Sequence, residues 1–470
     1  MSILPSRSAS WRRPLAASVV TLGTAAAMLL AVALAERRLG FAPDRLCAFL
    51  TAVSMLAFTR NRPPAEPSAI ARGLLLGAGL CGLQWLLARL LIDAHTPHIF
   101  DFACFYLDGR VALSGLDFYE PDNYRAVHWA IHWPVAYAVL LTRSADFELE
   151  ILNVAFPYPP PTMLLFAPLG WFTLDAAHRI WLAVLGASLV LASWLLARYV
   201  LIAARRLDAA LFALAVLVLS PASLSNAYFE QTNWLLLCCA VLALAARSAA
   251  WRGLAAALAV IIKPLGIFAA AYLLLARQWG AALACALVLT SLLLASAALF
   301  SAETVLHYFR ANPLAHLPAA VYWQDVNQSL SAVLLRGLRE SVPWRGSLAS
   351  YWPFIVLGGL LGVATLVACR AALRADDRAA AFCLLLVAAL MLYPGTLVHY
   401  AVLLSLPMLL LYLRVPQAWA WQITAALLSA GLTSLLAHGP FWAALALWLV
   451  FSGMALRSVG QVRAGKIKQV

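Results

Sequence analysis

The chain has 470 residues, of which 64% are hydrophobic and only 11% are charged. Soluble domains carry about 25% charged residues, so this composition excludes an ordinary soluble protein. The net charge of +13 does not indicate a nucleic-acid partner, because the basic residues are scattered singly between apolar runs, as the positive-inside rule predicts. These runs lack the alternation of barrel strands. The chain is therefore predicted to be an all-α polytopic membrane protein.

The apolar runs predict about 10–14 transmembrane or re-entrant helices. The first run is expected to be an uncleaved span with its N-terminus in the cytoplasm, the alternative being a signal peptide that is cleaved after Ala35. Several later runs are short, which suits re-entrant or broken helices as well as full crossings. The predicted spans are 15–35, 46–59, 69–92, 162–174, 179–201, 209–221, 233–247, 253–276, 280–300, 353–372, 380–394, 397–413, 419–437 and 440–456.

Two polar segments interrupt the spans and indicate the topology. Residues 93–160 hold nine of the twenty acidic residues but only three of the thirty-three lysines and arginines, so this segment is predicted to be a large extracytoplasmic loop. A second segment, 301–352, is long and rich in Pro, Trp and Tyr, and is placed on the same side. The basic tail, 457–470, is expected in the cytoplasm.

The first polar segment begins with acids mixed among aromatic residues, in the stretch DFACFYLDGR from Asp101 to Arg110. Aromatic residues favour the membrane interface, where they pack in short helices that lie flat on the bilayer. A carboxylate held there is partly desolvated, which raises its pKa and suits a general base acting on a hydroxyl. Asp101 is therefore a candidate base, the alternative being an ordinary acid in a solvated loop.

Lys263 is the strongest single candidate for a functional residue, because it lies inside an apolar run and the other two lysines of the chain are in the tail. An ammonium group in such a run costs about 2.5–3.5 kcal/mol on insertion scales, so it usually faces a cavity or a partner. Pro264 is expected to break the helix there and free carbonyl groups. The lysine could bind a phosphate as a point charge. Snorkelling to the interface is the alternative.

Four further motifs place polar or rigid residues beside apolar spans. Three consecutive prolines follow Tyr158 and predict an extended entry into a helix, or merely a stiff junction. Polar side chains at a span boundary often face a cavity, although a helix cap and turn, or a buried histidine, would explain them equally well. The polar candidates are Glu230, Gln231, Asn233, Asn327, Gln328, His399 and Tyr400.

Taken in order, these motifs resemble glycosyltransferase family 87, a group of polyprenol-phosphate-dependent glycosyltransferases of the GT-C class. The stretch 101–119 is similar to the family's first-loop signature, with Asp101 as its acid and Asp117 within its G-x-D-x-Y element. The family's F-x-Y-P-P motif is similar to 156–160, which contains Tyr158, and the helix motif that follows it is similar to 165–169.

The later family motifs also appear in the family's order, so that the resemblance extends from about residue 98 to residue 413. The G-Q-x-N element resembles 230–233, with Glu230 where the family has glycine, which puts the local turn in doubt and adds a carboxylate. The K-P, N-Q-S-L and H-Y elements resemble 263–264, 327–330 and 399–400.

The resemblance implies a single GT-C-like membrane domain over 1–470, located in the cell membrane with an extracytoplasmic active site. It implies inverting transfer of a hexose from a polyprenyl monophosphate to a hydroxyl of a glycolipid or polysaccharide. Mannose is the leading sugar, with arabinose or glucose fitting the same motifs. The expected partners are this donor, this acceptor and membrane lipids, with no cofactor and no metal.

The resemblance also assigns residue roles. Asp101 would be the general base, and Lys263 the first candidate for neutralising the departing phosphate, with His399 and Tyr400 as secondary candidates. The remaining substrate-binding candidates, which would orient sugar hydroxyls or phosphate, are Gln231, Asn233, Asn327, Gln328, Tyr158 and Asp117.

Two other functions fit parts of the pattern. Broken helices and an intramembrane lysine also suit a transporter or flippase for a lipid-linked or polar solute. No inverted repeat is evident in the sequence, and the long acidic, aromatic loop favours the transferase. A non-catalytic assembly factor that kept the fold is the second alternative, which the intact Asp101 disfavours and Glu230 leaves open.

Overall fold

The computed structural model describes residues 12–39, 69–95, 100–120, 123, 158–200, 213–214, 217–311, 327–337, 351–414 and 439–467. These residues are almost entirely helical, and their only β-type pairing is an isolated antiparallel bridge between Asn327 and Leu397. The predicted spans 46–59 and 419–437 lie outside the described residues. Within the described part, five segments are long and apolar enough to cross a membrane: Ala17–Ala35, Leu174–Tyr199, Trp279–Phe300, Trp352–Arg374 and Pro440–Arg457. The prediction of an all-α polytopic membrane protein is confirmed.

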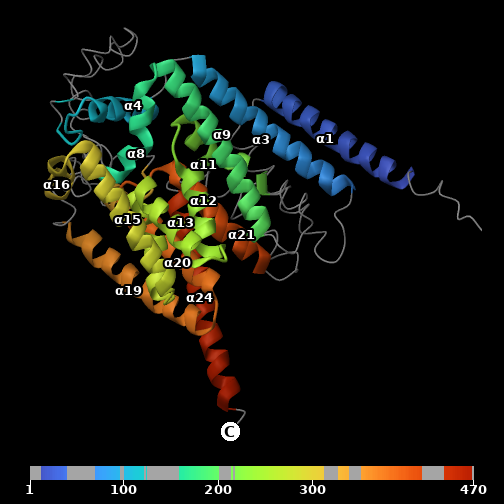
Figure 1. The fold of residues 1–470 in the computed structure, drawn as a ribbon. Coiled ribbons are helices and arrows are strands. Elements are labelled where there is room, and N and C mark those ends of the chain that lie inside the picture. The colour runs from blue at the N-terminus through green and yellow to red at the C-terminus, as the bar shows by residue number, and fades with distance from the viewer. Residues whose placement is uncertain are drawn as a thin grey trace, which may run out of the picture.

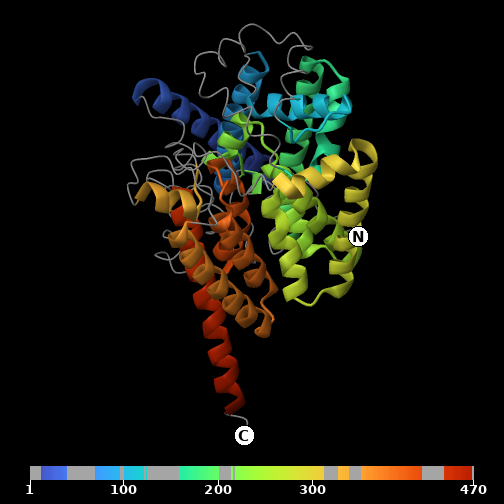
Figure 2. The same cartoon turned by 90° about the vertical axis from the view of Figure 1, so that its left-hand side faces the viewer.

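The helices form a bundle with a separate helical pair along one edge (Figures 1 and 2). In chain order the described elements are α1 (Arg12–Leu39), α3 (Ala69–His95), α4 (Phe100–Leu113), η2 (Pro160–Thr162), α8 (Met163–Phe166), η3 (Ala167–Trp171), α9 (Leu174–Tyr199), α11 (Pro221–Tyr228), α12 (Asn233–Ala245), α13 (Ala249–Ile262), η4 (Pro264–Gly266), α14 (Ile267–Leu275), α15 (Trp279–Phe300), α16 (Ala302–Ala311), α18 (Leu330–Gly337), α19 (Trp352–Arg374), α20 (Arg378–Leu392), η7 (Val398–Leu404), α21 (Ser405–Arg414) and α24 (Gly439–Ile467).

The edge pair consists of α1 and α3, which lie side by side in Figure 1. Their contact depends on small residues of α3. A Cβ atom added to Gly73 would lie 2.5 Å from Cβ of Thr24, and one added to Gly77 would lie 3.1 Å from the carbonyl oxygen of Ala25. Glycines spaced four apart let membrane helices approach closely, where dispersion contacts between backbones replace the hydrophobic effect. The pair is thus held by backbone proximity.

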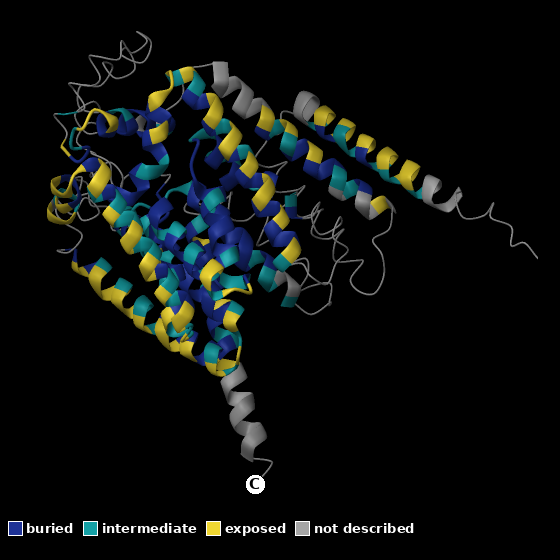
Figure 3. Ribbon diagram, viewed as in Figure 1, coloured by how far each residue is buried: buried dark blue, intermediate teal, exposed yellow. Residues whose placement is uncertain are grey.

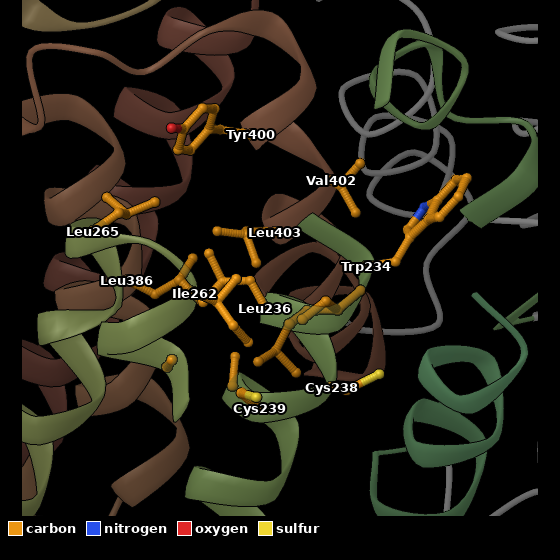
Figure 4. Close-up of a cluster of buried hydrophobic side chains, with 14 of the residues drawn as sticks. Trp234, Leu236, Cys238, Cys239, Ile262, Leu265, Leu386, Tyr400, Val402 and Leu403 are labelled. Carbon is orange, nitrogen blue, oxygen red and sulfur yellow. The ribbon is translucent and has the colours of Figure 1, made fainter. Parts of the chain in front are cut away.

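The core of the bundle is built from α12, α13 and α20, whose side chains are buried on most sides (Figure 3). Figure 4 shows this core, in which Leu236, Ile262, Leu386 and Leu403 converge, and Tyr400 and Trp234 lie at its borders. The outer helices α15 and α19 instead expose long apolar faces. Such faces suit contact with lipid, as expected of the outer helices of a membrane protein.

Three predicted spans are broken rather than continuous. The segment predicted at 162–174 is too short to cross, because its only α-helix, α8, has 4 residues between the 3₁₀ turns η2 and η3. The segment 253–276 divides into α13 and α14 at Lys263, as the following proline predicts, since proline lacks the N–H that a continuing helix requires. The segment 397–413 begins as the 3₁₀ helix η7 and becomes α-helical only at Ser405.

Candidate active site

Helix α4, which carries Asp101 in its first turn, packs against the segment formed by η2, α8 and η3. A Cβ atom on Gly109 would lie 2.7 Å from the carbonyl oxygen of Phe166, so only glycine permits this approach. The ring of Phe105 stacks on that of Phe166 with centroids 4.2 Å apart. Nη1 of Arg110 donates to the carbonyl oxygen of Gly170 at 3.0 Å. Aromatic stacking and backbone contact together set the position of Asp101.

Three side chains from distant parts of the sequence form one hydrogen-bonded chain. Nε2 of Gln231 donates to Oδ2 of Asp101 at 2.5 Å, and Nζ of Lys263 donates to Oε1 of Gln231 at 2.6 Å. Gln231 and Lys263 are buried, whereas Asp101 is partly accessible. Within the described residues, Oδ1 of Asp101 has no hydrogen-bond partner. The carboxylate is thus held on one oxygen, which leaves the other to accept a proton.

Aromatic residues lie around the ammonium group of Lys263. Nζ of Lys263 lies 3.8 Å from the ring centroid of Tyr400, a cation–π contact that stabilises the buried ammonium group. The ring of His399 stacks against that of Tyr400 with centroids 5.1 Å apart. The phenol group of Tyr158 lies close enough to that of Tyr400 to interact with it electrostatically. The structure therefore brings together Asp101, Gln231, Lys263, Tyr158, His399 and Tyr400, all of which were singled out in the sequence.

The lysine reaches this position because the chain stops being helical at Lys263. Its backbone is extended, with φ −153° and ψ 139°, between the end of α13 and the turn η4. The turn is compact, since a Cβ atom on Gly266 would lie 2.1 Å from the carbonyl oxygen of Ala259. On the other side, Oγ1 of Thr162 donates to the carbonyl oxygen of Ile261. This hydrogen bond connects the helix break at Lys263 to the 158–172 segment, which supports Asp101.

Burial raises the pKa of Asp101 from 3.8 to about 6. The hydrogen bond from Gln231 and the positive charge of Lys263 lower this pKa, whereas the negative charge of Glu230 adds to the rise. An efficient general base has a pKa near the working pH, because a weaker base accepts the proton less readily and a stronger one is already protonated. The electrostatics of Asp101 therefore match the task of proton acceptance.

The sequence model of glycosyltransferase family 87 matches residues 156–399, just over half of the chain. This protein belongs to glycosyltransferase family 87. The match contains Gln231 and Lys263, begins after Asp101 and ends directly before Tyr400. No curated protein and no solved structure matches the chain at a significant level.

Glu230 stands where the family 87 motif has glycine, and it keeps the turn that a glycine would favour. Its φ is +50°, in the left-handed region, where side-chain-bearing residues are disfavoured by roughly 1–2 kcal/mol. Two contacts hold it there. Its Oε1 lies 2.6 Å from Nε2 of His178, and its carbonyl oxygen accepts from Nε1 of Trp181 at 2.9 Å. The doubt about the local turn is therefore resolved, because α9 contacts compensate for the strained backbone that presents Gln231.

We expect Glu230→Ala to destabilise the transferase more than Glu230→Gly does. Both variants lose the contact with His178, but only alanine keeps a Cβ atom in the left-handed region, so the two should differ by about 1 kcal/mol in free energy of unfolding. Thermal unfolding of both purified variants in the same detergent measures this difference. Equal melting temperatures would contradict the assignment of backbone strain to Glu230.

Several of the remaining sequence candidates support the site through the backbone. Asn233 donates from its own N–H and from Nδ2 to Oδ1 of Asn226, which joins α11 to α12. Nδ2 of Asn327 donates to the carbonyl oxygen of Pro394 at 2.8 Å, and the N–H of Gln328 donates to that of Thr396 at 2.6 Å. The contacts of Asn327 and Gln328 fix the turn that precedes His399 and Tyr400.

Asp117 belongs to a second polar cluster, in which α16 joins the residues that follow α4. Its Oδ2 lies 2.6 Å from Nδ1 of His307, and its Oδ1 accepts from the N–H of Tyr119 at 2.9 Å. The hydroxyl of Tyr119 in turn donates to the carbonyl oxygen of Tyr158. The link between the two clusters is therefore the backbone of Tyr158.

Two histidines that the sequence did not single out take part in these arrangements. His178 and His307 lie 52 and 190 residues from the carboxylates they contact. Neither is adjacent to a motif, so only the unexplained acids Glu230 and Asp117 could have prompted a search for partners. Within the described residues, no group of three or more His, Cys, Asp or Glu side chains lies close enough to hold a metal ion. Metal-free catalysis stays a prediction.

Proposed function

We propose that this family 87 glycosyltransferase moves a hexose, with mannose as the leading candidate, from a polyprenyl monophosphate to a hydroxyl of a glycolipid or polysaccharide. The single observation that carries the proposal is the Asp101–Gln231–Lys263 chain. It combines a buried cation with a carboxylate of which one oxygen has no partner among the described residues. A base for the acceptor and positive charge for a departing phosphate are what such a transfer requires.

The proposed reaction is one displacement at the anomeric carbon of the sugar. The acceptor oxygen forms the new bond to this carbon while its proton passes to Oδ1 of Asp101. The bond between the carbon and the phosphate oxygen breaks on the opposite face, so the configuration inverts and polyprenyl phosphate leaves with its negative charge. Lys263, His399 and Tyr400 are the proposed groups for this phosphate, and Tyr158 and Asp117 border the space for the sugar or the acceptor.

The lipid-linked donor is supported by the setting of the site. The outer helices α15 and α19 expose apolar faces, and a polyprenyl chain is soluble only in lipid. We place the site on the extracytoplasmic side of the cell membrane, because the acidic, arginine-poor segment 93–160 contains Asp101. Membrane lipids and the two substrates are the proposed partners.

The donor class is tested with purified protein in nanodiscs that contain a membrane lipid extract. Radiolabelled polyprenyl-phosphate mannose, glucose and arabinose are supplied separately, and the corresponding nucleotide sugars serve as the control arm. Transfer to lipid-extractable or polymeric product from one polyprenyl-phosphate sugar alone is expected. Transfer from nucleotide sugars would contradict the lipid-linked donor, and flux of label across the bilayer without transfer would favour the transporter.

We expect the transfer rate at low substrate concentration to fall as the pH drops below about 6. A base with a raised pKa is active above that pKa and inactive below it, so protonation of Asp101 removes the proton acceptor. At pH 5 the rate should be roughly a tenth of its plateau, given one proton and a pKa near 6. A pH profile of kcat/KM measures this limb, and a plateau that extends to pH 4.5 would argue against Asp101 as the base.

A further inference from the structure

A cavity of about 790 Å³ lies between the turn that joins α14 to α15 and the turn that joins α19 to α20. It is lined by Arg277, Arg370, Arg374 and Arg378, with Asp376 as its one acidic residue. Four guanidinium groups around one space are unusual in a chain of which only 11% is charged. The cavity is therefore strongly electropositive.

Among the described residues, only one of the four arginines of this cavity has a carboxylate partner. Nε of Arg378 lies 3.4 Å from Oδ1 of Asp376, in an exposed pair. Among the described residues, Arg277, Arg370 and Arg374 have no carboxylate within ion-pair distance. Arg370 and Arg374 are one turn apart on α19 and so repel one another, which only the C-terminal end of the helix dipole partly offsets. An anion bound between them would relieve this repulsion.

The cavity lies at the opposite end of α15 from the Asp117 cluster. Helix α15 has 22 residues, which corresponds to about 33 Å at 1.5 Å per residue, close to the thickness of the hydrocarbon core. It begins at the cavity with Trp279 and leads into α16, which carries His307. The cavity is thus at the membrane boundary opposite the candidate active site, as the course of α15 in Figure 1 shows.

The surface beside the cavity is apolar and faces outward. Leu274 lines the cavity and is 53% exposed, and Leu283 and Leu287 continue this surface along α15 with exposures of 62% and 59%. Trp279, at 64% exposure, stands between the two regions, in the position that tryptophan favours at membrane interfaces. A ligand that fits both surfaces has an anionic head and apolar chains.

We propose that this cavity binds the phosphate headgroup of an anionic membrane phospholipid, whose acyl chains lie along the exposed leucines of α15. Guanidinium groups bind phosphate oxygens in pairs, which favours this use of arginine. The positive-inside rule explains why arginines occur on this side, but it does not require that four of them line one cavity. The ligand is a structural lipid, distinct from the sugar donor of the proposed function.

Native mass spectrometry of delipidated full-length protein in detergent tests this proposal. The probes are dioleoyl phosphatidylglycerol and dioleoyl phosphatidylcholine, titrated separately. The combined substitution Arg277→Gln, Arg370→Gln and Arg374→Gln should weaken phosphatidylglycerol binding at least about tenfold. A control with the same loss of charge combines Arg179→Gln, Arg247→Gln and Arg457→Gln, three exposed arginines outside the cavity. It should bind phosphatidylglycerol like the wild type.

Three outcomes would overturn the proposal. Equal weakening in the cavity variant and the control would reduce the effect to general surface charge. Equal binding of phosphatidylcholine by the wild type would remove the preference for an anionic headgroup. Displacement of phosphatidylglycerol by millimolar inorganic phosphate would assign the cavity to a free anion. If the glutamine variant fails to fold, Arg370→Lys with Arg374→Lys decides the question, because unchanged binding in that variant contradicts paired recognition of phosphate. None of these outcomes depends on sugar transfer.

Discussion

Asp101→Asn is expected to reduce sugar transfer about 10²–10⁴-fold, the usual contribution of a general base. Asparagine has the shape of aspartate, and its side-chain oxygen still accepts a hydrogen bond from Nε2 of Gln231, so the site should keep its geometry. What is lost is the ability of Oδ1 to take the acceptor's proton. Transfer from the preferred polyprenyl-phosphate sugar, with binding of the donor measured in parallel, checks this result.

The matched control for this substitution is Asp175→Asn, which removes an exposed carboxylate in the first turn of α9. It changes the charge of the protein equally and should transfer sugar at close to the wild-type rate. If Asp101→Asn retained the wild-type rate, the base would lie elsewhere and the transferase assignment would stand. If both variants lost activity equally, a general charge effect would replace the specific role of Asp101.

Lys263→Met is expected to have the second largest effect, lowering kcat/KM by about 10–100-fold. Hydrogen bonds to charged groups contribute about 1.5–3 kcal/mol, and this one keeps Gln231 directed at Asp101. Because the charge of Lys263 lowers the pKa of Asp101, its removal should also move the acidic limb of the pH profile to higher pH. The pH profile of kcat/KM in the variant measures both changes.

A purely structural lysine would give a different pattern. It would lower the melting temperature without moving the acidic limb, since protonation of Asp101 would then be independent of Lys263. Lys468→Met, in the basic tail, is the matched control, and it should change neither kcat/KM nor the limb. Unchanged turnover and unchanged donor affinity in Lys263→Met would contradict both the contact with Gln231 and the proposed role at the phosphate.

The sequence predicts those parts of this molecule that depend on local chemistry. Pro264 lacks an N–H, so the helix break at Lys263 could be expected without any knowledge of tertiary contacts. The helical class follows equally from the length of the apolar runs. Asp101 and Gln231 were recognisable as polar residues beside apolar spans, and Lys263 as a charged residue inside one.

What the sequence does not predict is which candidates touch. Gln231 bridges residues that are 130 positions before it and 32 positions after it, and no local rule encodes such a pairing. Asn233 and Asn327 have the same amide chemistry, yet their side chains bond to Asn226 and to a backbone carbonyl. His178 was overlooked because the strained turn at Glu230 is a property of the backbone, which is visible only in three dimensions.

The interruption at Lys263 also has a consequence for the synthesis of the protein and its insertion into the membrane. Synthesis proceeds from the N-terminus, so Asp101 and Gln231 leave the ribosome before the lysine does. The segment with the costly ammonium group thus enters a bilayer in which its hydrogen-bond acceptor is already present, and Tyr400 arrives afterwards to cover it. The order of residues along the chain therefore places the hydrogen-bond acceptor of Lys263 ahead of this charge during synthesis.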